Sequence, residues 1–213
     1  MTLKDNLLES ITIENKWRET DFANMKRIYE NLSSSNDLQK MFLRMCVPYI
    51  YAHWEGYAMS SLKLLLGFLN DLQLSYNDVT VNLFVLSLGD KFSFLKGKQS
   101  FEQRCEFSNN FLSTLSNKEL KFDKKSISSK SNLNADVLEE LCQIFGFNFN
   151  NFSNYTTGLN QLVNIRNHIA HGENGYKLDL DKLGNYMELV TNLNLILFTE
   201  IKRFIEEENY KKN

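Results

Sequence analysis

The fold of this chain is decided by its most hydrophobic stretch, residues 37–72, which reads DLQKMFLRMCVPYIYAHWEGYAMSSLKLLLGFLNDL. Apolar side chains recur there every three or four residues on two faces, among them Phe42, Met45, Tyr49, Val47, Ile50 and Trp54. A helix that is apolar on more than one side is typical of the centre of a helical protein. We therefore predict a long central helix, with a kink or a new start at Pro48, the only proline.

The segments on either side also follow a helical period, and they indicate an all-α protein. Further helices are expected at approximately residues 3–32, 79–88, 99–116, 135–146, 156–171 and 179–209. The stretch 79–88 is also compatible with a buried strand, but no partner strand is evident nearby. We expect Asn134 to cap the helix that follows it, and Gly146 and Gly172 to end helices. Residues 120–133 and 148–154 are expected to be exposed loops.

Composition limits the classes of function. The chain has 213 residues, 43% of them hydrophobic, and a formal net charge of −2, which suits one globular domain without a strongly basic face for duplex DNA. Residues 89–130 carry nine Lys and Arg against five acids. This basic segment is either a solvated surface or a rim that attracts phosphates, with Lys121, Lys124 and Lys125 as RNA-binding candidates.

Targeting and metal-binding patterns are not evident. The start of the chain lacks the apolar run of a signal peptide, and no stretch reaches the roughly 20 apolar residues of a membrane span. The three cysteines are widely spaced and form no CxxC pair, so neither a disulfide framework nor a thiolate zinc site is expected. We predict a soluble, cytoplasmic protein with no cofactor and no metal.

The residues best suited to chemistry lie in one short string, Arg166-Asn167-His168-Ile169-Ala170-His171-Gly172, which holds two of the three histidines. Arginine has a permanent charge and a planar fork that suits phosphate, and histidine exchanges protons near neutral pH. Together they can cleave a phosphodiester: a base takes the 2′-hydroxyl proton, an acid protonates the leaving oxygen, and a cation stabilises the phosphorane.

Helix geometry refines this hypothesis. Asn167 and His171 are four residues apart and share a helix face, whereas Arg166 and His171 differ by about 140° around the axis. Cleavage works best with two proton carriers, and one such helix offers one dependable histidine. A two-fold dimer that pairs two copies of this helix would supply two arginines and two histidines.

The string RNHIAH resembles the Arg-x(4–6)-His motif of the HEPN superfamily, in its R-N-x-x-x-H form. The segment from Tyr51 to Tyr57, YAHWEGY, and the later SNLNADVLEELCQIFGF resemble a bacterial branch of that superfamily found in toxin–antitoxin and phage-defence loci. The resemblance implies a HEPN-type helical bundle with additional helices. It would form one domain over residues 1–213, with a core at about 37–209 and an N-terminal helical extension at 1–32.

The resemblance further implies an RNase that needs no metal and forms a homodimer through its motif helices, often a toxin held by an antitoxin. By position, Arg166 and His171 would be catalytic and Asn167 would orient the site. The alternative is a degenerate HEPN module that binds RNA, a nucleotide or a protein partner without cleaving.

Three further residues are candidates for support. His168 has no fixed role in the motif; it would be a second proton carrier, or a zinc ligand with His171 if Glu173 or His53 completed the site. Glu55 either pairs with Arg166 across the helix interface or lies at the helix surface. His53, in the apolar centre of the same helix, is expected to be a core histidine with satisfied hydrogen bonds.

Overall fold

The computed structural model describes residues 2–32, 36–89, 100–116 and 119–212, and within these ranges it is built of helices without a β-strand. The α-helices are α1 (Leu3–Asn31), α2 (Asn36–Asp71), α3 (Val81–Leu88), α4 (Phe101–Ser116), α5 (Ala135–Phe145), α6 (Thr156–Ala170) and α7 (Leu180–Glu206). Two 3-10 helices, η2 (Lys124–Ser126) and η3 (Phe149–Tyr155), connect them. The predicted all-α class is confirmed.

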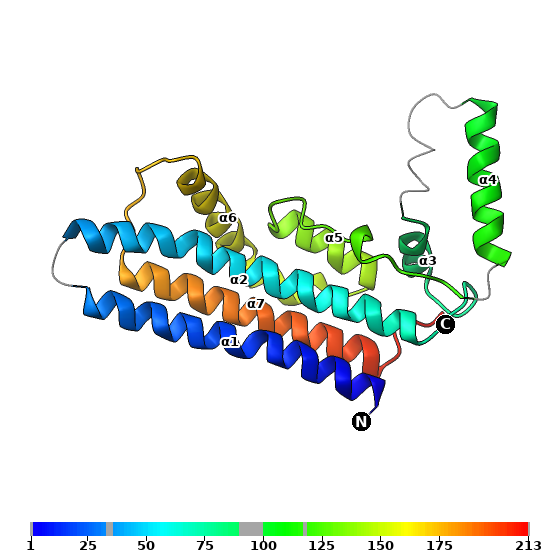
Figure 1. Cartoon of the computed structure of the whole chain (residues 1–213), viewed down its shortest axis with the longest axis horizontal. Helices are drawn as coiled ribbons and strands as arrows, with labels where there is room; N and C mark the ends of the chain where they lie inside the picture. Colours follow the sequence, from blue (N-terminus) through cyan, green and yellow to red (C-terminus); the bar gives the residue numbers. More distant parts are fainter. Residues whose placement is uncertain (1, 33–35, 90–99, 117–118, 213) are drawn as a thin grey trace.

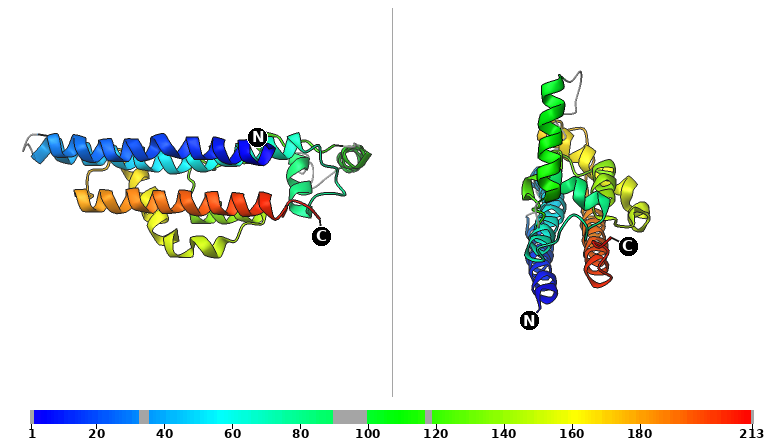
Figure 2. Two further views of the ribbon diagram at one scale, coloured as in Figure 1. Left: turned by 90° about the horizontal axis from the view of Figure 1, so that it is seen from below. Right: turned by 90° about the vertical axis from the view of Figure 1, so that its right-hand side faces the viewer.

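The three longest helices form the body of the molecule. Helices α1, α2 and α7 run side by side, and α5, α6 and η3 pack around α2 and α7 (Figures 1 and 2). Trp54 of α2 and Val190 of α7 have no exposed surface. Helix α1 adds Ile11 and Phe22 to the same core, so the N-terminal segment, expected to be an extension, packs here as part of the bundle.

The central helix is continuous. Helix α2 runs through Pro48 from Asn36 to Asp71, although proline removes one backbone hydrogen bond. Val47 and Ile50, on either side of Pro48, have no exposed surface. We attribute the continuity to this burial, because tertiary packing supplies most of the stability of a helix in a folded protein.

The ends of α5 follow their local sequence. The Asn134 side chain accepts a hydrogen bond from Val137 N at 3.0 Å, and Gly146 is left-handed with a φ of 69°. Both ends were predicted, and both are confirmed.

Two segments expected to be exposed loops are more ordered. Residues 149–155 form η3, in which Phe152 has no exposed surface. In residues 120–133 the polar side chains are largely exposed, but four apolar ones are buried: Leu120, Phe122, Ile127 and Leu133. Their burial was not predicted, because the segment is mostly polar and only these few apolar side chains attach it to the body.

Candidate active site

Helix α6 positions the predicted motif. Leu159 and Leu162 have no exposed surface and hold one face of α6 against the core. Gly172, with a φ of 84°, follows the helix, and His171 is its C-terminal cap residue, whose backbone N–H donates to Asn167 O at 3.0 Å. The last turn therefore ends at the surface with the motif side chains around it.

Arg166 points toward α2 and is half-buried. Its Nη1 donates to Oδ1 of Asn167 at 2.7 Å and to Oδ1 of Asn132 at 3.2 Å. Its Cζ lies 4.5 Å from the centre of the Tyr51 ring, a cation–π contact. These partners are neutral, and no carboxylate of the described residues forms an ion pair with Arg166. The guanidinium is therefore oriented while it keeps a charge that an anion can use.

Tyr51 is a structural support of this arrangement. Its hydroxyl accepts a hydrogen bond from Leu133 N at 2.6 Å, and the Trp54 indole donates to Leu133 O at 3.1 Å. Burial raises the pKa of Tyr51 to about 12, and the charge of Glu55 adds to the rise while that of Arg166 opposes it. The phenol therefore stays protonated near neutral pH.

The ion pair expected between Glu55 and Arg166 is not formed. Glu55 is half-buried on α2, but Arg166 is directed at the two asparagine oxygens and the Tyr51 ring instead. Asn132 and Tyr51 were not singled out as site residues. Asn132 lies in a polar loop 34 positions before Arg166, and no local pattern marks it.

The two motif histidines differ in exposure, since His168 is half-buried and His171 is exposed. The His171 side chain forms no hydrogen bond or ion pair with the described residues. His168 Nδ1 lies 2.7 Å from Glu173 Oε2, and its ring centre lies 5.4 Å from that of Tyr176. The zinc alternative has no geometric support, since no group of three His, Cys, Asp or Glu in the described part of the chain could hold a metal ion.

His53 lies apart from the motif, between α2 and α1. It is 2% exposed, and Trp17, Phe22 and Tyr49 surround its ring. Neither ring nitrogen has a hydrogen-bond partner among the described residues; the nearest carboxylate oxygen, of Asp21, is 3.7 Å from Nε2. His53 is thus a core residue as predicted, but its hydrogen bonds are not satisfied.

Burial is the main cause that lowers the pKa of His53, and the charge of Arg18 lowers it further. Arg18 is only 4% exposed and donates from Nε to the carbonyl oxygen of His53 at 3.2 Å. It was not predicted, although it follows Leu7 and Ile11 on the apolar face of α1. A charged residue in a core stripe is the signal that could have found it.

The predicted lysine cluster lies away from the motif. Lys121, Lys124 and Lys125 are exposed, and Lys121 forms an ion pair with Glu119 at 3.3 Å. Phe122, in the same segment as these lysines, binds Asn70 near the end of α2. Arg166 instead lies on Tyr51, which precedes Asn70 along that helix by about 28 Å at 1.5 Å per residue. Lys91, Lys96, Lys98 and Lys118 of the basic segment lie outside the described residues.

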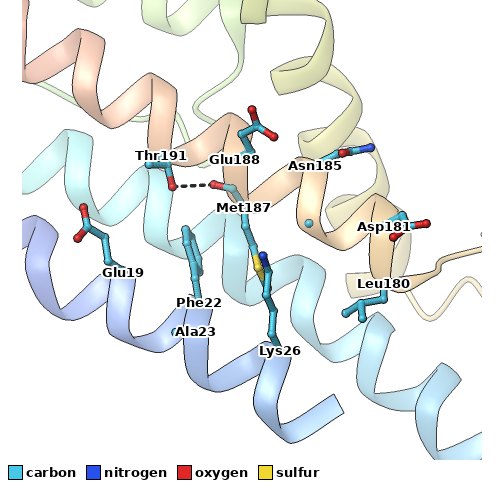
Figure 3. Close-up of a pocket in the computed structure, with 11 residues that line it drawn as sticks. Glu19, Phe22, Ala23, Lys26, Leu180, Asp181, Asn185, Met187, Glu188 and Thr191 are labelled. Atoms are coloured by element: carbon cyan, nitrogen blue, oxygen red, sulfur yellow. Dashed lines mark hydrogen bonds between the residues drawn. The ribbon is translucent and has the colours of Figure 1, made fainter. Parts of the chain in front are cut away.

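A separate groove of about 850 Å³ runs between α1 and α7 (Figure 3). Phe22 and Met187 lie between the two helices in it, and Glu19, Lys26 and Glu188 are charged residues of its lining. It contains none of the predicted site residues.

None of the described helices combines the length and apolarity that a membrane crossing needs. This all-α chain is a domain of the HEPN superfamily, as its match to a family model shows. Within it, the chain belongs to the RiboL-PSP-HEPN family, whose model matches residues 13–207. The comparison with curated proteins gave no match, and neither did the comparison with solved structures. HEPN domains act as RNases or as RNA-binding modules, and the family match indicates this class of function.

Proposed function

We propose that this protein is an endoribonuclease that cleaves RNA at the end of α6 without a metal ion. The observation that carries the proposal is the guanidinium of Arg166, which neutral partners orient and which no described carboxylate neutralises, five residues before the exposed imidazole of His171 at the end of α6. An oriented cation next to a group that exchanges protons is what phosphodiester cleavage requires.

The proposed reaction is an internal transfer. An imidazole takes the proton of the ribose 2′-hydroxyl, and the 2′-oxygen then forms a bond to phosphorus. The bond from phosphorus to the 5′-oxygen breaks, and a second imidazole donates a proton to that oxygen. Arg166 stabilises the charge that develops on the phosphorus-bound oxygens. The products are a 2′,3′-cyclic phosphate and a 5′-hydroxyl.

Two proton carriers are best supplied by a homodimer, because each chain ends α6 with one histidine in the motif position. An exposed apolar stripe on α2 supports self-association: Leu38, Met41, Met45 and Tyr49 follow one another at helical spacing and are 45–63% exposed. The stripe lies in the same half of α2 as Tyr51, which contacts Arg166, but roughly 120° around the helix axis from it. Apolar patches of this kind mark interaction sites.

The proposal is tested by incubating total RNA with the purified protein in a chelator. We expect wild type to produce 2′,3′-cyclic phosphate ends, and His171→Ala and Arg166→Ala to cut about 100-fold to 10,000-fold more slowly, the usual contribution of a positioned acid–base group. Asn164→Ala, an exposed change on the same helix, is the matched control and should cut like wild type.

Equal inertness of wild type and His171→Ala, with RNA still bound, would instead identify a non-cleaving RNA-binding module. A toxin role adds one further expectation in cells. Expression of wild type should arrest growth, and Arg166→Ala should relieve the arrest if cleavage causes it. An antitoxin would be a protein whose co-expression restores growth.

A further inference from the structure

A second groove, of about 640 Å³, lies beside the candidate active site. It is formed between the first turns of α2, which contribute Lys40 and Arg44, and residues 174–178 in the loop after α6. Tyr176 in this loop also contacts the ring of His168, with ring centres 5.4 Å apart. The groove thus connects directly to the last turn of the motif helix.

The groove is positively charged on a chain whose net charge is −2. Lys40, Arg44 and Lys177 line it together with a single acid, Asp37. Lys40 and Lys177 are exposed and form no ion pair with the described residues, and Arg44 donates to the neutral side-chain oxygen of Asn174. All three cations therefore remain available to an anionic ligand.

These cations lead toward Arg166 along one side of α2. Lys40 and Arg44 are one turn apart, and Tyr51 follows Arg44 by seven residues, which is two turns or about 10 Å. Arg166 lies against the Tyr51 ring. A chain of phosphates that passes Arg166 would therefore meet Arg44 and then Lys40 as it continues along the helix.

We propose that this groove holds the phosphate backbone of a single-stranded RNA segment next to the scissile linkage, with a base against Tyr176. The inference rests on the proposed function, because it assigns the path of the same substrate. Lysine and arginine bind phosphates irrespective of sequence, and an aromatic ring on a basic groove stacks the unpaired bases of a single strand. In this proposal the groove is the RNA-binding surface nearest the motif. It takes the place of the predicted cluster of Lys121, Lys124 and Lys125, whose segment contacts the far end of α2.

The test measures binding in the His171→Ala background, which keeps the RNA intact. A fluorescently labelled single-stranded RNA is titrated with the protein between about 50 and 200 mM salt, and the logarithm of the affinity is plotted against the logarithm of salt concentration. Lys40→Ala with Lys177→Ala should weaken binding and make the slope shallower by about 0.7 for each lysine, the value for one phosphate contact of a single strand. Lys124→Ala with Lys125→Ala removes the same charge elsewhere and should leave the slope unchanged.

Tyr176 has its own readout. Tyr176→Phe keeps the ring and should bind like the parent, whereas Tyr176→Leu should lose roughly fivefold or more in affinity, because stacking on a base is lost. Thermal unfolding of each variant checks that the loop remains folded.

The outcomes separate this inference from the proposed function. Suppose that wild type cuts RNA through Arg166 and His171, while the Lys40 and Lys177 variant keeps the parent's affinity and salt slope. The groove is then not the RNA path, but the proposed nuclease activity is retained. If the control pair at Lys124 and Lys125 flattens the slope instead, the RNA path lies there and the groove is again wrong. If the His171→Ala protein binds no RNA at any salt concentration and wild type does not cut, both proposals fail.

Discussion

Arg166 is held by oxygens that carry no formal charge. Asn132 and Asn167 each accept from its Nη1, and the Tyr51 ring lies against its other side. A carboxylate in the same place would bind the guanidinium more strongly, but it would also compete with a phosphate for the same charge. Orientation without neutralisation is the property that makes this arginine suitable for an anionic substrate.

His53 gives a pH-dependent prediction. Its pKa is lowered in the folded protein, so below its ordinary value of 6.5 the unfolded chain binds a proton that the folded chain excludes. Wild type should therefore lose stability as the pH falls below 6.5, by at most about 1.4 kcal/mol per pH unit from this residue. His53→Leu has a side chain of similar volume that cannot be protonated. Its free energy of unfolding relative to that of wild type should therefore increase as the pH is lowered from 7 to 5.

Urea unfolding of both proteins at several pH values provides the measurement. At pH 7 the substitution should change stability by less than about 1.5 kcal/mol, because no hydrogen bond of a ring nitrogen is lost. Parallel pH profiles for the two proteins would show that His53 is protonated equally well in both states, contrary to the expectation.

At the scale of elements, the short segment before α5 joins three helices. Leu133 binds Tyr51 and Trp54 of α2 through its backbone, and Asn132 contacts Arg166 of α6. Ala135 N donates to Asn160 of α6 at 2.9 Å. The start of α5 and the orientation of Arg166 are thus coupled through residues that are adjacent in the sequence.

The cap of α5 can be tested separately. Asn134→Ala removes the acceptor for Val137 N and should lower the free energy of unfolding by about 1 kcal/mol. Asn164→Ala makes the same chemical change on the exposed face of α6 and should not destabilise, since alanine is the better helix former. Equal unfolding midpoints in urea for Asn134→Ala and wild type would mean that the cap contributes nothing.

At the scale of the whole molecule, α2 organises both the core and an open surface. It packs against α1, α6 and α7, while Leu38, Met41 and Met45 of its apolar stripe are exposed; Tyr49, at the end of the stripe, donates from its hydroxyl to Asp21 of α1. The proposed dimer places this stripe in its interface. A single chain would then hold a complete fold but only part of the chemistry.

Charge placed in the stripe should separate folding from activity. Met41 and Met45 are 46% and 63% exposed, so Met41→Glu with Met45→Glu should leave the helical content unchanged. We expect light scattering to show a dimer for wild type and a monomer for the variant, because charges are depleted at the centre of protein interfaces. Cleavage should fall roughly 100-fold or more with the second histidine gone.

Leu195→Glu is the matched control, since Leu195 is 61% exposed on α7. It should remain dimeric and active. A wild-type protein that is monomeric and still cuts RNA would contradict the dimer.

Local sequence patterns predicted the helices and their ends more reliably than the side-chain contacts between residues distant in the sequence. The Asn134 cap and the left-handed Gly146 and Gly172 were foreseen because each depends on the few residues around it. The contact of Asn132 with Arg166 and that of Arg18 with His53 were not foreseen, because they join residues 34 and 35 positions apart. Of the two alternatives left open for Glu55, the ion pair with Arg166 is not formed, because packing directs the guanidinium to Asn132, Asn167 and the Tyr51 ring.

The sequence by itself determined the all-α class, the main helices and the string that carries Arg166, Asn167 and His171. Helix periodicity, caps and glycine conformations are interactions between near neighbours, so they can be recognised along the chain. Only the tertiary structure decided that Arg166 lies on Tyr51 and donates to two asparagine oxygens, that His53 is enclosed between α1 and α2, and that Lys40 and Arg44 line a groove with the loop after α6. Those arrangements depend on how distant helices pack, and the side chains that bury the most surface determine that packing.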